Sequence, residues 1–137
     1  MNNYIKVVLK IYGEPIEDNE WEITDDNKAE GDMDTKPTEA MASEAKRGLD
    51  WRKEYNRGGT EVGVARAVQL VNRENLSERT IKRMFSFFSR HEVDKQAKGF
   101  RKGEEGYPSA GRIAWALWGG DAGFSWSKRK TQEIRNR

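Results

Sequence analysis

The chain has 137 residues, a net charge of +2 at pH 7 and no cysteine. This length suggests one domain with at most an appended arm, and it is sufficient for a modest hydrophobic core. Without cysteine the chain has no disulfide, no thiolate zinc site and no cysteine nucleophile. The chain has no long apolar run, so we expect no membrane span. Its first residues are not a basic segment followed by an apolar one, so we expect no signal peptide.

The charge is divided unevenly along the chain. Residues 1–35 contain three lysines and ten acidic residues, a net charge of −7. Residues 36–137 contain 22 basic and 13 acidic residues, a net charge of +9. A basic body of this kind attracts polyanions, and an acidic leader can compete for the same surface. Blocks of charge are also common on ordinary solvated surfaces, so both interpretations stay open.

The N-terminal segment predicts β structure followed by a linker. Residues 4–12 are mostly β-branched and aromatic, which favours a strand, and residues 21–23 are a possible partner. A lone hairpin is marginal in water, so this strand packs on the body or pairs with a neighbouring subunit. We therefore expect a β leader at residues 1–24, an acidic linker at residues 25–37 and a basic helical domain at residues 38–137.

Two helices are predicted after the linker. The first begins after Thr38, which is able to cap it, and ends near Tyr55 before a glycine pair. Its apolar face carries Met41, Ala45 and Leu49. The second covers residues 60–71, with Thr60 as the cap and one valine-rich and alanine-rich face.

The third helix has the clearest start. Ser77 is a favourable cap, and Leu76 and Ile81 have the spacing of a hydrophobic staple. The residues that continue its apolar stripe at helical spacing are Met84, Phe85 and Phe88. This pattern predicts a helix from residue 77 to about His91.

The C-terminal part predicts a loop and two more helices. Residues 93–108 are charged and contain glycine, which indicates a loop. Ser109 begins a short helix that is apolar on nearly all sides and is therefore buried. The next two glycines end it, and Asp121 is able to cap a last helix. The predicted fold is mainly α, a compact bundle of four or five short helices with an N-terminal β-strand or hairpin.

Basic residues gather on two of these helices. The first set is Arg79, Lys82, Arg83 and Arg90, and the second is Lys128, Arg129 and Lys130 beside Trp126. Such cations are able to neutralise nucleic-acid phosphates. The order of helices 60–71 and 77–91 also resembles a helix-turn-helix, although the connecting turn is long and adenine-reading amides are absent. The alternative is an ordinary solvated helix face with a basic, soluble end.

A weaker pattern concerns His91, Glu92 and Asp94. One histidine and two carboxylates within four residues are able to hold a divalent metal or transfer protons, with Asp121 as a distant third carboxylate. Zinc requires more nitrogen or sulfur ligands than this set provides. The alternative is a helix end where His91 meets the last carbonyl groups. We therefore expect no metal and no cofactor. A set of aromatic residues at helical spacing is assigned to the core: Phe85, Phe88, Trp115, Trp118, Phe124 and Trp126.

Three segments together resemble a known family. They are the glycine turn and helix start at residues 57–66, the third helix with its charged end at residues 76–95, and residues 107–123. Over residues 38–127 the chain is similar to a small uncharacterised domain of tailed phages and prophages. This domain occurs as a short protein or near head-morphogenesis proteins such as prohead proteases. The resemblance implies a virus context but no activity and no functional residue.

The sequence therefore favours a non-enzymatic phage protein that is associated with the virion or head. It would bind nucleic acid or another head protein through its basic helical face, in the virion or the host cytoplasm. One alternative is a small metal-dependent enzyme that acts on nucleic acid or a nucleotide. A second alternative is a phage inhibitor of a host protein, in which the acidic leader imitates nucleic acid.

Overall fold

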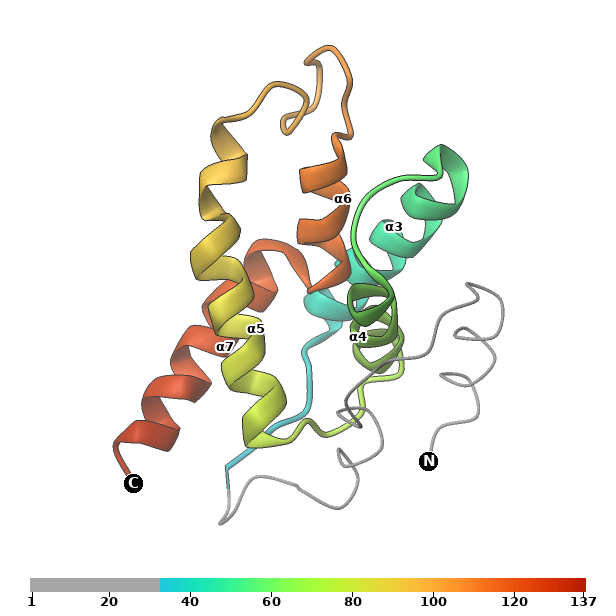
Figure 1. Ribbon diagram of the computed structural model, residues 1–137. Coiled ribbons are helices and arrows are strands. Elements are labelled where there is room, and N and C mark those ends of the chain that lie inside the picture. The colour runs from blue at the N-terminus through green and yellow to red at the C-terminus, as the bar shows by residue number, and fades with distance from the viewer. Residues whose placement is uncertain (1–32) are drawn as a thin grey trace.

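The computed structural model describes residues 33–137, so the predicted strand at residues 4–12 lies outside the described part. This part is mainly helical, which confirms the predicted class (Figure 1). Its elements are α3 (Glu39–Tyr55), α4 (Glu61–Val71), α5 (Glu78–His91), the 3₁₀ helix η1 (Glu92–Gln96), α6 (Ala110–Leu117) and α7 (Gly120–Arg135). The short helix η1 is a correction, because its residues were predicted to be mostly loop.

Hydroxyl caps determine where four of the helices begin. The caps predicted from the sequence at Thr38, Thr60 and Ser77 are confirmed. Ser109, which was predicted to begin the next helix, is its cap. In each case the side-chain oxygen accepts a hydrogen bond from the backbone N–H three residues later, at 3.0 to 3.3 Å. Each bond satisfies one of the N–H groups that the first helical turn leaves without an intrahelical partner.

The start of α7 differs from the prediction. Asp121 does not cap it, because Gly119 occupies the cap position with a φ of 109°. A left-handed conformation of this kind favours glycine. The chain turns sharply here, and a Cβ atom at Gly123 would lie 2.6 Å from the Trp118 carbonyl oxygen. The tight turn therefore depends on small residues, and it leaves the Asp121 side chain available for another contact.

Helices α3, α4 and α6 form one packed group (Figure 1). The backbones of α3 and α6 approach closely at Gly48, where a Cβ atom would lie 2.7 Å from the backbone nitrogen of Leu117. Positions 63–70 of α4 are all buried. The fold therefore buries more residues of α4 than its predicted apolar face.

Helices α5 and α7 form the second group and run antiparallel side by side (Figure 1). The Phe124 ring lies 5.2 Å from Phe88 and 6.2 Å from Phe85. At the other end, a guanidinium nitrogen of Arg137 lies 2.6 Å from a carboxylate oxygen of Glu78. Because α5 packs against α7 while α4 packs against α3 and α6, the helix-turn-helix interpretation is wrong.

The end of the predicted acidic linker lies against this body. The backbone N–H of Leu76 donates to the carbonyl of Thr35 at 3.1 Å, and the Arg73 side chain donates to the carbonyl of Pro37 at 2.8 Å. Thr35 is 5% exposed. The predicted aromatic core is confirmed for Phe88, which is fully buried, and for three tryptophans, whereas Phe85 and Phe124 are half-buried. Trp115, Trp118 and Trp126 are at most 8% exposed.

Across residues 33–137, no helix is long and apolar enough to cross a membrane.

Candidate functional site

The pairing of α5 with α7 brings together the two basic segments that the sequence singled out. Lys82 lies four residues after Glu78, which pairs with Arg137 just beyond α7, and three before Phe85, which contacts Phe124 of α7. Residues at this spacing share one edge of a helix. Lys128 follows Phe124 by four residues, so it lies on the edge of α7 that faces α5. Lys82 and Lys128 therefore border the same seam, although 46 positions separate them in the sequence.

The predicted cations differ in how available they are. Lys82, Arg90, Lys128 and Arg129 are exposed, and no ion pair joins them to other residues in the part of the chain that the structure describes. We call these four exposed side chains of α5 and α7 the basic surface, of which Lys82 and Lys128 border the seam. Arg79 is also exposed and Arg83 is half-buried. The Lys130 ammonium lies 3.8 Å from a carboxylate oxygen of Glu133 and 6.0 Å from the Trp126 ring centre. Its side chain is only 13% exposed, so Lys130 already has partners within the fold.

The weaker pattern around His91 has a structural explanation. The Nδ1 atom of His91 lies 3.2 Å from a carboxylate oxygen of Asp94, and its ring lies 4.5 Å from the Phe87 ring. Glu92 is exposed. Within residues 33–137, no three histidine, aspartate or glutamate side chains come together as a candidate metal site. The metal-dependent enzyme therefore has no supporting site in this part of the chain.

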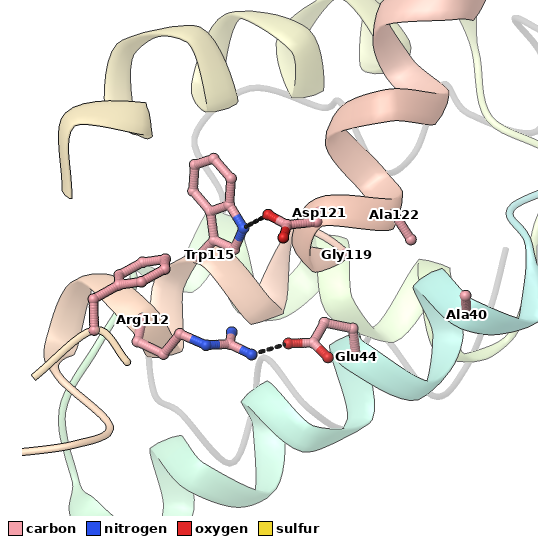
Figure 2. A pocket seen from close by; sticks show the side chains of 8 residues that line it. Ala40, Glu44, Arg112, Trp115, Gly119, Asp121 and Ala122 are labelled. Carbon is pink, nitrogen blue, oxygen red and sulfur yellow. Dashed lines mark hydrogen bonds and ion pairs between the residues drawn. The ribbon is translucent and has the colours of Figure 1, made fainter. Parts of the chain in front are cut away.

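A charged cavity that the sequence did not suggest lies between α3, α6 and the start of α7 (Figure 2). Its volume is about 250 Å³. On one side, the Arg112 guanidinium donates to a carboxylate oxygen of Glu44 at 2.5 Å. On the other, the Trp115 indole N–H donates to a carboxylate oxygen of Asp121 at 2.9 Å. These two polar contacts connect three helices around one cavity.

Asp121 has a second partner in η1. The Lys95 ammonium lies 2.8 Å from the same carboxylate oxygen that accepts from Trp115. Partial burial raises the pKa of Asp121, but the hydrogen bonds from Lys95 and Trp115 outweigh it, so the pKa lies below its usual value. The carboxylate is therefore ionised at neutral pH and acts as an acceptor only.

Two aromatic rings contact Arg112 in addition to its carboxylate partner. Its guanidinium carbon lies 5.0 Å from the Trp51 ring centre and 5.7 Å from the Phe100 ring centre. The side chain is 14% exposed. Its second terminal nitrogen, Nη1, is buried and has no hydrogen-bond partner among the described residues. A buried donor of this kind is costly unless a ligand or a water satisfies it.

The sequence could not have identified this cavity. Glu44 and Arg112 are 68 positions apart, and neither belongs to a local pattern of charged residues that suggests a site. Trp115 was assigned to the core and Asp121 to a helix cap. The crossing of α3 with α6 brings Glu44 to Arg112, and the turn from α6 into α7 brings Asp121 to Trp115.

The chain was compared with known proteins in three ways. No protein-family model, no curated protein and no solved structure matches it. The similarity to a phage head-region domain therefore stays a prediction from the motifs in residues 57–66, 76–95 and 107–123.

Proposed function

We propose that this protein is a non-enzymatic phage component that binds nucleic acid through the basic surface on α5 and α7. The observation that carries the proposal is that two basic segments, distant in the sequence, lie on adjacent antiparallel helices. Together α5 and α7 contain eight lysine and arginine residues and three acidic residues, a net charge of +5. The association with a virion or head, and the location in the virion or host cytoplasm, rest on the family resemblance alone.

Binding through such a surface is expected to be independent of base sequence. Lysine and arginine neutralise phosphates and release condensed counterions, which contributes affinity but reads no base. The exposed face of α5 offers Ser86 and Ser89 between its cations and no asparagine or glutamine. Because amide side chains are the usual adenine readers, this face has no means of reading adenine directly.

A salt series tests the proposal. If all four cations of the basic surface contact phosphates, the logarithm of the duplex-DNA association constant should fall with the logarithm of salt concentration with a slope of roughly −3 to −4. Fluorescence anisotropy with a labelled duplex of arbitrary sequence measures this slope. An absence of binding even at low salt would overturn the proposal and leave a protein partner in the head as the remaining option.

Paired variants locate the binding surface. Lys82→Gln combined with Lys128→Gln should weaken binding roughly tenfold and make the salt slope shallower by about 2, because two phosphate contacts are lost. The matched control is Lys46→Gln combined with Lys53→Gln, which removes the same charge from exposed positions of α3. Equal effects of the two double variants would show that net charge, rather than the basic surface, controls binding.

A further inference from the structure

A second cavity, separate from the basic surface, lies under the loop at residues 97–108. Its volume is about 390 Å³, and we call it the loop cavity. The cationic side chains that line it are Lys95, Arg101, Lys102 and Arg112. Asp121 is the single carboxylate in its lining among the described residues, and Phe100 and Tyr107 provide aromatic walls. The lining therefore has a formal excess of three positive charges, which falls to two when Glu44, the carboxylate partner of Arg112, is counted.

Among the described residues, the acidic side chains of the loop form no ion pair with these four cations. Glu104 accepts hydrogen bonds from the backbone N–H groups of Gly99 at 3.1 Å and Arg101 at 2.9 Å. The backbone bond from Arg101 is the main reason why the pKa of Glu104 is lowered. Glu105 lies 3.6 Å from the ammonium of Lys98. Glu104 thus holds the loop in shape, and Arg101 and Lys102 form no ion pair within the described residues.

The loop is anchored at both ends, so the cavity exists before any ligand arrives. The backbone N–H of Ser109 donates to the carbonyl of Gly99 at 2.9 Å and closes the loop. The Arg57 guanidinium, from the turn after α3, donates to the carbonyl groups of Gly106 at 3.2 Å and Pro108 at 2.9 Å. A preformed site loses less conformational entropy when a ligand binds.

Two of the four cations are already ion-paired with a carboxylate. Glu44 holds one edge of the Arg112 guanidinium, while Nη1 remains buried without a partner among the described residues. Asp121 holds Lys95. Arg101 and Lys102 are exposed and complete the cationic part of the lining. This combination of ion-paired and exposed cations suits a compact dianion with several acceptor oxygens.

We propose that the loop cavity binds the phosphate group of a small phosphate monoester. A phosphate carries close to two negative charges at neutral pH and three strong acceptor oxygens, which matches the excess charge of the lining. The cavity is larger than a phosphate group, and its Phe100 and Tyr107 walls accept a planar organic group. A nucleoside monophosphate is therefore the ligand class. This inference does not depend on the binding of nucleic acid by α5 and α7.

Calorimetric titration of the full chain with dAMP, inorganic phosphate and adenosine tests the proposal. We expect dAMP to bind, phosphate to compete with it, and adenosine to show no binding at the same concentration. Arg101→Gln combined with Lys102→Gln should weaken dAMP binding about tenfold or more, since two charge-assisted contacts are lost. Both residues are exposed loop positions, so folding should be retained and is checked by circular dichroism.

Two controls separate this site from the basic surface and identify the source of the phosphate. The variant with Lys82→Gln and Lys128→Gln should bind dAMP as the unchanged protein does. Unchanged dAMP affinity in the Arg101 and Lys102 variant, or equal binding of adenosine, would overturn the proposal.

A competition experiment identifies the source of the phosphate. A short single strand with a 5′-phosphate that displaces dAMP better than its 5′-hydroxyl counterpart would indicate that a strand end is the natural source. Equal displacement would indicate a free nucleotide.

Discussion

The indole nitrogen of Trp115 donates a hydrogen bond to the Asp121 carboxylate at 2.9 Å, while Lys95 contacts the same oxygen at 2.8 Å. One carboxylate therefore connects the buried helix α6, the first turn of α7 and the 3₁₀ helix η1. A buried indole N–H needs an acceptor, and Asp121 supplies it. This contact explains why Asp121 is used within the fold rather than as a helix cap.

The lowered pKa of Asp121 predicts a pH-dependent contribution to stability. Its folded pKa lies below the unfolded value, so the contribution is complete above the unfolded pKa near 4 and is lost as the pH falls through the folded pKa. The side chain is 76% exposed, so solvent screens the ion pair. We expect Asp121→Asn to lower the free energy of unfolding by no more than about 1 kcal/mol at pH 7. Urea denaturation at pH 7 and pH 3 measures the difference, which should shrink at the lower pH. If Asp121→Asn lowers the free energy of unfolding equally at pH 7 and pH 3, the charge of the carboxylate is not the cause.

The close crossing of α3 and α6 predicts that Gly48 does not tolerate a side chain. In a helix interior, alanine is normally more stable than glycine by about 1 kcal/mol. At this position, however, the added Cβ atom would lie 2.7 Å from the Leu117 backbone nitrogen, and backbone is unable to move aside cheaply. We expect Gly48→Ala to destabilise the protein by about 1–3 kcal/mol in urea denaturation. Ser43→Ala, at an exposed position of the same helix, should be neutral or slightly stabilising. A stabilised Gly48→Ala variant would show that the two helices separate at little cost.

Local signals in the sequence were sufficient for most of the helices but not for η1, the start of α7 or the sites. A cap such as Ser77 and an apolar stripe act within a few residues, so both can be read from the chain directly. The pairing of helices is a long-range property. The chain order of α4 and α5 suggested a helix-turn-helix, but the aromatic contacts of Phe85 and Phe88 with Phe124 join α5 to α7 instead. For the same reason nothing local marked Glu44 and Arg112 as partners.

The ion pair between Glu44 and Arg112 should contribute more than an exposed pair on the same helix. Their side chains are only 19% and 14% exposed, so solvent screens them weakly. A double-mutant cycle with Glu44→Gln and Arg112→Met should give a coupling energy of about 1–3 kcal/mol. The matched cycle at Lys46 and Asp50, which are 3.3 Å apart and about two-thirds exposed, should give at most about 0.5 kcal/mol. Equal coupling in the two cycles would mean that burial does not strengthen the inner pair.

Neighbouring lysines of α7 should differ in their effect on nucleic-acid binding. Lys128 is exposed beside the α5–α7 seam, whereas Lys130 lies against Trp126 and Glu133 with 13% of its side chain exposed. Lys128→Gln should therefore weaken duplex-DNA binding and reduce the salt slope by about 1. Lys130→Gln should leave the affinity nearly unchanged, although it removes the same charge two residues away. Anisotropy titrations at several salt concentrations compare the two variants directly. Equal losses would show that DNA responds to the total charge of α7, and the basic surface as defined by its exposed cations would then be wrong.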